Sequence, residues 1–307
     1  MGSDDFTPHR RRLLDVAYRI LGTVTDAEDV VQEAWLRWSA ADRSEVSSPQ
    51  AFLVTVTTRL AIDRLRQVRA RREAYPGAWL PELISTRPDP QARAELAESV
   101  ELALLVVLET LSPLERAAFV LHEAFGLSHA EVGEVIGRSE AATRQLARRA
   151  RDHVREARPR YRADRAQRRR LTERFLAACF GGDLAGLVDL LAADVRLVAD
   201  GGGRAKAPLR VIESAERVGR FLTAISNDEG AQRFLASIGL PTPAAFEIAI
   251  EDVNGAPAIV ARVGERVILV LAVEPDGERV GTVFLVANPE KLARVSRRAG
   301  GAASTPA

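Results

Sequence analysis

Apolar residues recur at helical intervals through residues 9–73 and predict three helices there. The first helix ends at Gly22, the second begins near Asp26, and the third begins after Pro49. The apolar face of the first helix consists of Leu13, Leu14, Ala17, Tyr18 and Leu21. We therefore expect an all-helical domain over residues 1–75.

A proline-rich segment follows, and we expect it to be a linker over residues 76–95. Its prolines exclude a continuous helix, because proline lacks the backbone N–H that a helix requires. The segment nevertheless holds four large apolar residues, Trp79, Leu80, Leu83 and Ile84. Such residues predict that the linker docks on another part of the protein.

Helical periodicity returns after the linker, and we expect a second all-helical domain over residues 96–163. Ser128 and Glu131 have the spacing of a capping box, which marks the start of a helix. Gly137 ends that helix, and Ser139 caps the next one. Two short helices joined by a tight turn predict a helix-turn-helix.

The pattern changes after residue 163 and predicts an α+β domain over residues 164–295. We expect helices near 167–180, 183–192 and 210–225, a strand at 195–199, and four strands at 244–253, 257–263, 267–273 and 279–287. Asn254-Gly255 and Asp276-Gly277 have the composition of tight hairpin turns. The tail over residues 296–307 is rich in Ala and Gly, and we expect it to be disordered.

Charge is segregated along the chain, although 43 basic residues nearly balance 42 acidic ones. Residues 138–170 hold thirteen Arg and four acids, whereas residues 26–33 hold four acids and no base. The single Cys179 and four scattered His have no metal-ligand spacing, so we expect no metal and no cofactor. No apolar run reaches membrane-spanning length and no signal peptide is evident, so we expect a cytoplasmic protein without a membrane partner.

The segment Ser139–His153 is the candidate DNA-recognition helix. Arg144, Gln145 and Arg148 are the candidates for base contacts, because Arg reads guanine edges and Gln reads adenine. Arg149, Arg151 and Arg155 are candidates for phosphate contacts. The alternative is an arginine-coated surface helix inside an ordinary helical domain.

Two of the first three helices carry candidate binding residues. Acidic and polar residues on the second helix favour a protein partner over DNA, the alternative being a solvated face. These candidates are Asp26, Asp29, Gln32 and Glu33. The third helix combines Phe52 with a basic half that suits single-stranded DNA. Its candidates are Arg59, Arg64, Arg66 and Arg69.

These three features, in this order, resemble an extracytoplasmic-function (ECF) RNA polymerase sigma factor. The stretch 26–38 is similar to the region-two helix that binds the polymerase clamp, and residues 51–66 are similar to the promoter-melting segment. Residues 111–154 resemble region four, which reads the upstream promoter element. The resemblance implies a protein that binds core RNA polymerase and promoter DNA and directs transcription initiation.

Three further motifs resemble the SigJ-like subgroup, which carries a SnoaL-like cone after region four. They are Trp79-Leu80-Pro81-Glu82, Asp200-Gly201-Gly202-Gly203-Arg204 and Asn288-Pro289-Glu290-Lys291-Leu292. Leu83 replaces a second Pro, Arg204 replaces Lys, and Glu290 replaces Asp of the subgroup pattern. The resemblance implies that the cone contacts the linker and modulates the sigma part in cis.

SnoaL-like cones include polyketide cyclases and relatives of ketosteroid isomerase, which need an acid–base group. Residues 162–307 contain no His, Tyr or Trp, and the candidate bases reduce to Asp189, Asp194, Asp200 and Glu213. We therefore expect no catalytic residue and no enzyme. The alternatives are a one-component regulator with a ligand-sensing cone and a cyclase or isomerase with a DNA-binding arm. A small ligand of unnamed class in the cone is a further expectation.

Overall fold

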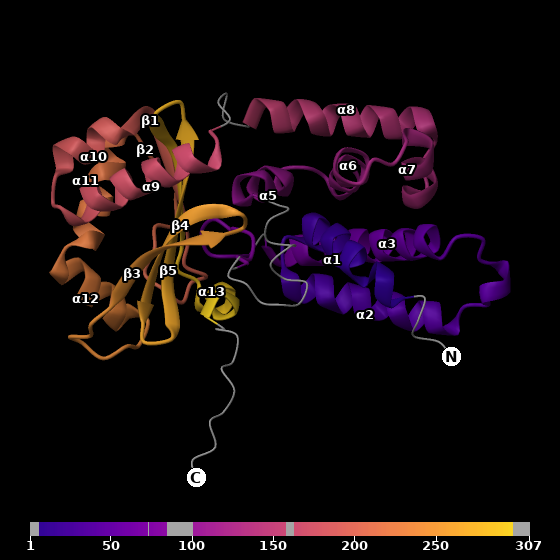
Figure 1. Cartoon of the computed structure of the whole chain (residues 1–307), viewed down its shortest axis with the longest axis horizontal. Coiled ribbons are helices and arrows are strands. Elements are labelled where there is room, and N and C mark those ends of the chain that lie inside the picture. The colour runs from indigo at the N-terminus through magenta and orange to yellow at the C-terminus, as the bar shows by residue number, and fades with distance from the viewer. Residues whose placement is uncertain (1–5, 73, 85–100, 158–162, 297–307) are drawn as a thin grey trace, which may run out of the picture. The chain divides into compact units, whose positions relative to one another are not determined.

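The computed structural model describes residues 6–72, 74–84, 101–157 and 163–296, and these form two compact units (Figure 1). The first unit combines residues 1–74 with 102–158, and the second combines 75–101 with 159–307. The expectations for residues 85–95 and 297–307 lie outside the described residues. By its contacts, the described part of the linker belongs to the second unit.

The first unit begins with three helices, α1 (Thr7–Leu21), α2 (Val24–Ala40) and α3 (Pro49–Arg72). Helix α1 ends as expected, because Gly22 adopts a φ of 75° that favours glycine and donates its N–H to the Tyr18 carbonyl. Trp38 of α2 packs on Phe52 of α3 with ring centroids 5.6 Å apart. The apolar periodicity thus produces a core between these helices, with α2 beginning two residues earlier than expected.

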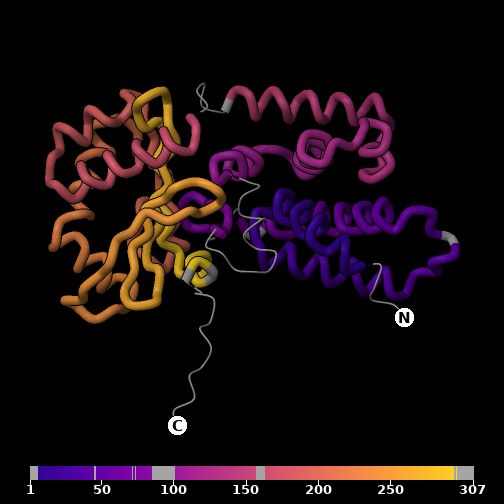
Figure 2. The backbone as a smooth tube through the Cα atoms, in the orientation of Figure 1, coloured from indigo at the N-terminus to yellow at the C-terminus, as the bar shows by residue number. Residues whose placement is uncertain are grey.

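The rest of the first unit is α5 (Leu102–Glu109), α6 (Pro113–Phe119), a π-helical turn η2 (Val120–Ala124), α7 (His129–Ile136) and α8 (Glu140–Ala157). The Ser128–Glu131 capping box is present at the start of α7. Gly137 ends α7 with a φ of 66°, and the Ser139 hydroxyl accepts the Ala142 N–H at 3.3 Å. Helices α7 and α8 therefore form the expected helix-turn-helix (Figure 2).

A mixed sheet forms the centre of the second unit, with strand order β2-β1-β6-β5-β4-β3. Its strands are β1 (Leu191–Asp200), β2 (Ile212–Glu213), β3 (Glu247–Val253), β4 (Ala256–Val263), β5 (Arg266–Asp276) and β6 (Arg279–Val286). Strands β3 to β6 form the expected antiparallel meander, and β1 pairs with β6 in parallel. Asn254 and Gly255 have φ of 49° and 71°, which a tight hairpin turn requires.

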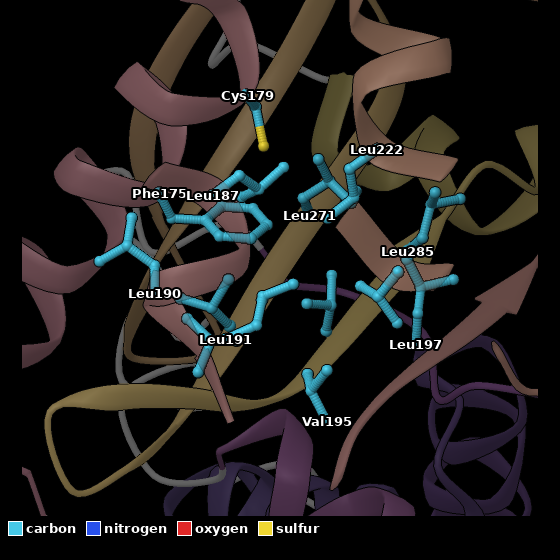
Figure 3. Packing of buried hydrophobic residues seen from close by; sticks show 14 of the residues in the cluster. Phe175, Cys179, Leu187, Leu190, Leu191, Val195, Leu197, Leu222, Leu271 and Leu285 are labelled. Atoms are coloured by element: carbon cyan, nitrogen blue, oxygen red, sulfur yellow. The ribbon is translucent and has the colours of Figure 1, made fainter. Parts of the chain in front are cut away.

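One face of the sheet is covered by α9 (Arg165–Phe180), α10 (Leu184–Leu190), α11 (Ala215–Ser226) and α12 (Asp228–Ser237). Phe175, Leu187 and Leu271 point into the apolar cluster between these layers (Figure 3). Helix α12 has no counterpart among the expected elements. Helix α11 begins at Ala215, not near 210, because Ile212–Glu213 pairs with β1 as β2. The expected α+β fold class is confirmed for this unit.

The opposite face of the sheet is also buried. Val260, Val270 and Phe284 alternate with the residues of the first face and so point away from it. Helix α13 (Pro289–Ser296) contacts β5 and lies across the strands from α10–α12 (Figure 1). Linker residues Leu80, Leu83 and Ile84 are buried in the same unit. Residues 76–84, the described part of the linker, are therefore part of a folded layer.

Candidate functional site

The outer stripe of α8 presents the residues expected to contact bases. Arg144, Gln145 and Arg148 are all exposed, and the Arg148 side chain is 81% exposed. Arg144 pairs with Glu140 one turn earlier, at 2.5 Å, without leaving the surface. The buried face of α8 meanwhile packs Leu146, Ala147, Ala150 and Val154 against its own unit. The sequence of α8 thus directs its cations outward.

Arg149 and Arg151 lie on the flanks of the outer stripe and pair with acids of neighbouring elements. Arg149 bonds Glu115 of α6 at 2.8 Å, and Arg151 bonds Glu123 of η2 at 2.6 Å. Burial alone would raise the pKa of Glu115, but hydrogen bonds from Ser112 and Arg149 outweigh it and lower that pKa. These two arginines therefore hold α8 on its scaffold, in addition to any contact with phosphates.

The arginines of α3 are engaged to different degrees. Arg66 is 53% exposed and pairs with Asp63 on its own helix. Arg64 bonds Asp26 of α2 at 2.7 Å and so ties the two helices together. Arg59 and Arg69 donate to backbone carbonyls of the segment 109–135 within the first unit.

The acidic surface of α2 is smaller than the sequence predicts, because Asp26 is turned toward Arg64 and is only 15% exposed. Asp29 is 63% exposed, Gln32 is exposed, and Glu33 pairs with Arg37 at the surface. Two large apolar residues of α2, Trp35 and Leu36, are also exposed, at 40% and 49%. Exposed acidic and apolar side chains on one helix suit a protein partner, and the candidates drawn from the sequence did not include Trp35 and Leu36.

Asp200 is the centre of the contact between the linker and the α+β fold. Its buried carboxylate accepts hydrogen bonds from the Tyr75 hydroxyl at 2.6 Å, the Leu80 N–H at 2.9 Å and the Lys291 ammonium at 2.5 Å. The Gly202 N–H adds a fourth bond at 3.0 Å. A carboxylate removed from water needs such donors, because an unpaired buried charge is strongly unfavourable.

Lys291 and Asn288 of the third motif complete this linker contact. The Lys291 ammonium also bonds the Leu80 carbonyl, and it lies 4.0 Å from the centre of the Trp79 ring. Asn288 donates to the Tyr75 hydroxyl at 2.8 Å, and burial with the Asp200 bond raises the Tyr75 pKa. Tyr75 was missed by sequence reasoning, although an aromatic residue directly before Pro76 is a usable signal.

The glycines of the Asp200 loop lie too close to their neighbours to carry a side chain. A Cβ on Gly202 would lie 2.4 Å from the Asn288 side chain, and one on Gly203 would lie 2.7 Å from Pro76. Their φ of 62° and 68° also favour glycine. A Cβ on Gly201 would lie 2.5 Å from the Ala205 carbonyl.

The remaining motif residues support the contact from its edges. Pro81, Glu82 and Leu292 are buried, Pro289 begins α13, and Arg204 pairs with Glu290 at the surface at 2.7 Å. Further along the linker, Ile84 and Asn254 exchange two hydrogen bonds, one through the Asn254 side chain. All three subgroup motifs thus meet within the second unit.

Known proteins share these features over nearly the whole chain. Residues 6–72 match the Sigma-70 region 2 family, and residues 101–154 match the Sigma-70, region 4 family. The chain is 39% identical to the ECF RNA polymerase sigma factor SigJ of Mycobacterium tuberculosis over 95% of this chain and 93% of that protein. This chain is an ECF RNA polymerase sigma factor.

Further relatives of the sigma factor agree with that assignment. It is 33% identical to the probable ECF RNA polymerase sigma factor SigI of Mycobacterium tuberculosis, over 95% of each chain. The crystal structure of Mycobacterium tuberculosis SigJ superposes with a TM-score of 0.73 and 36% identity, covering 95% of this chain and 98% of that one. The protein is thus a transcription initiation factor and not an enzyme.

The sigma factor's α+β domain has a small apolar cavity between its helices and its sheet. A cavity of about 50 Å³ is lined by apolar residues that include Phe180, Phe234 and Leu271. Asp189, Asp194 and Glu213 are exposed, and Asp200 is occupied by the linker. The expected small ligand stays a prediction.

The described residues offer neither a metal site nor a membrane-spanning helix. Among residues 6–72, 74–84, 101–157 and 163–296, no three His, Cys, Asp or Glu side chains are grouped to hold a metal ion. Within the same part of the chain, no helix combines the length and apolarity needed to cross a membrane.

Proposed function

We propose that the C-terminal α+β domain of this sigma factor modulates transcription initiation in cis by holding linker residues 75–84. The observation that supports the proposal is the buried Asp200 carboxylate, which bonds Tyr75 and Leu80 of the linker and Lys291 of α13. A linker that served only as a spacer between two DNA-binding regions would not require a buried carboxylate to bind it.

The linker contact favours two discrete states over gradual loosening. Removing one partner of a buried ion pair costs about 3–5 kcal/mol, because the other charge is left unpaired. Exposing Leu80 or Leu83, both fully buried, costs roughly 1.5–3 kcal/mol each. The linker therefore docks as a whole or leaves as a whole, which is the property a switch needs.

Docking changes how far region two and region four can separate along the chain. The two regions, residues 6–72 and 101–154, are joined through the linker. When residues 75–84 are fixed on the α+β domain, only residues 85–100 can adjust the separation between region two and region four. A shorter connection lowers the largest separation that the chain permits. We assign to this restraint the control of promoter engagement.

Two surfaces of the helical regions complete the proposed function. Asp29, Gln32 and Glu33, together with exposed Trp35 and Leu36, form the face for core RNA polymerase. For promoter DNA, Arg144, Gln145 and Arg148 read bases, Arg149 and Arg151 hold phosphates beside their structural pairs, and Arg66 contacts the melted strand.

The cis proposal is tested with Lys291→Gln, which removes one charge of the buried pair and keeps a side chain of similar length. Lys206→Gln is the matched control, because Lys206 is exposed and is the other lysine of the chain. We expect Lys291→Gln to accelerate hydrogen exchange in residues 75–84 and to change transcription with core polymerase about tenfold, with unchanged promoter preference.

Gly202→Ala is the second variant, because its Cβ would collide with Asn288 while every charge is kept. Both variants should change transcription in the same direction, and Lys206→Gln should match the parent protein. Faster exchange in residues 75–84 with unaltered transcription would show that docking is structural only and would refute the proposal.

A further inference from the structure

The basic part of the sequence continues past the helix-turn-helix onto helix α9. Five of the sixteen residues of α9 are arginines, and its one acidic residue is Glu173. The candidates for contacts with promoter DNA end at Arg155, whereas α9 belongs to the second compact unit. The surroundings of each arginine decide whether it supports the fold or is available to a ligand.

Three of these arginines are bonded to carboxylates. The pairs are Arg165–Asp252 at 2.5 Å, Arg168–Glu274 at 3.1 Å and Arg169–Glu173 at 3.1 Å. The other two, Arg170 and Arg174, are exposed and have no carboxylate partner among the described residues. They lie one turn apart on the same side of the helix, where like charges repel each other. An anion bound between them would remove that repulsion.

Arg170 and Arg174 line a cavity of about 200 Å³ between α9 and the turn that joins β5 to β6. Pro275, Gly277 and Glu278 form the opposite wall. Gly277 leaves that wall open, since a Cβ there would meet no atom within 4 Å. Glu278 is exposed and is the one acid among the described lining residues. The cavity therefore has a cationic wall on the helix and one acidic residue on the turn.

The size and donors of the cavity define the class of ligand. A volume of about 200 Å³ equals the share of roughly seven water molecules at about 30 Å³ each. Pockets for drug-sized ligands are larger, at roughly 300–1,000 Å³. Each guanidinium offers a planar fork of N–H donors that matches phosphate oxygens, and two positive charges together favour a doubly charged anion. A phosphate group satisfies both conditions.

We propose that Arg170 and Arg174 bind the phosphate group of a small ligand in the cavity between α9 and the β5–β6 turn. Bound phosphate would connect the helix to the turn and make both more rigid. Asp200, Asn288 and Lys291, which hold the linker, are not among the described lining residues. The site is therefore separate from the linker contact and does not rest on the proposed cis modulation.

The site is tested by calorimetric titration of the full chain with inorganic phosphate, with chloride holding the ionic strength constant. We expect Arg170→Gln and Arg174→Gln each to weaken phosphate binding about tenfold or more, because each removes a charge-assisted fork. Arg220→Gln is the matched control, since Arg220 of α11 is exposed, pairs with Glu216 and loses the same charge. Thermal unfolding should be unchanged in all three variants, because each side chain is exposed.

Glu278→Gln provides a test with the opposite sign. It removes the acidic residue of the cavity and keeps both arginines, so phosphate should bind up to about fivefold more tightly, the range of a solvent-exposed charge pair. Hydrogen exchange locates the site independently. Phosphate should slow exchange in residues 163–174 and 275–278 of the parent protein and leave the double variant Arg170→Gln, Arg174→Gln unaffected.

The backbone of DNA presents the same chemical group, so a short duplex of random sequence is the second probe. Loss of phosphate binding in the arginine variants, with duplex affinity unchanged, would support a site for a small ligand. A parent protein that shows no saturable phosphate binding would overturn the proposal, and so would equal weakening by Arg220→Gln. Loss of duplex affinity in the double variant, without phosphate binding by the parent, would assign the two arginines to DNA and also overturn it.

Discussion

Ionisable side chains buried in the α+β domain determine how its stability depends on pH. Glu274 of β5 is 7% exposed and bonds Arg168 of α9 at 3.1 Å, with Glu101 on the other side of the same guanidinium. Burial raises the pKa of Glu274 to about 7, although Arg168 opposes the rise. The sequence marks neither partner, because Glu274 and Arg168 come from elements 106 positions apart.

The raised pKa of Glu274 predicts a loss of stability with increasing pH. The folded state favours the protonated carboxyl, so its contribution is complete below an unfolded pKa of 4.5 and disappears by about pH 7. The resulting decrease in the free energy of unfolding is at most about 3 kcal/mol. We expect Glu274→Gln to flatten the dependence, measured by urea unfolding of the second unit with hydrogen exchange. The exposed Glu278→Gln is the control, and equal slopes for both variants would contradict the assignment.

At the scale of elements, the ends of helices and the positions of hairpin turns are predicted well where one residue type determines the local backbone conformation. The Ser128–Glu131 box, Gly22 and Asn254-Gly255 all act where the sequence places them, because each satisfies or permits a specific backbone geometry. Helix α12 was missed, although Asn227 caps it through its side chain at 2.8 Å. Gly230 in its first turn weakens the local helical signal, and packing of Leu235 supplies the stability instead.

Alanine substitutions on the outer stripe of α8 should weaken DNA binding, whereas those on its flanks should lower the stability of the helix-turn-helix. Arg148→Ala should cost roughly 1–3 kcal/mol of specific DNA binding and relax the preference at one base pair. Arg149→Ala should instead lower the stability of the helix-turn-helix by less than about 1 kcal/mol, because its pair with Glu115 is partly solvated. Binding to promoter and random DNA, together with thermal unfolding, measures both effects.

Glu115→Ala makes the comparison a double-mutant cycle. Non-additive stabilities for Arg149→Ala and Glu115→Ala would show that the pair acts as a unit. An equal loss of affinity on promoter and random DNA for Arg148→Ala would place the reading face elsewhere.

For the whole molecule, the compact units do not correspond to consecutive blocks of the sequence. The expected domains follow the sequence in consecutive blocks, whereas each compact unit is assembled from two separated segments. The apolar linker predicted docking, but Asp200 and its partners Tyr75 and Lys291 are 125 and 91 positions apart. No periodicity relates positions so distant. The subgroup motifs connected Asp200 with Lys291, whereas Tyr75 lies in none of these motifs and was missed.

Polymerase binding provides a test at the same scale. We expect Asp29→Arg, or Gln32→Ala combined with Glu33→Arg, to weaken core-polymerase binding about tenfold or more. Because these side chains are exposed, the substitutions should change the free energy of unfolding by no more than about 0.5 kcal/mol. Titration of labelled protein with core enzyme measures the affinity, and Glu229→Arg on exposed α12 is the charge-reversal control. Parent-like affinity in both α2 variants would remove this surface from the polymerase interface.

The linker's docking partners lie late in the chain, so a molecule that is still being synthesised cannot yet dock its linker. Residues 75–84 leave the ribosome well before Asp200, Asn288 and Lys291, because synthesis proceeds from the N-terminus. At 5–20 residues per second, the roughly 200 intervening residues take about 10 to 40 seconds. Both DNA-binding regions are complete once residue 154 is synthesised, and the roughly 140 residues that remain before Lys291 take about 7 to 30 seconds. During this time the nascent molecule has both regions but nothing for the linker to dock on. Under the proposed cis modulation, the speed of translation thus sets how long each new molecule remains unrestrained.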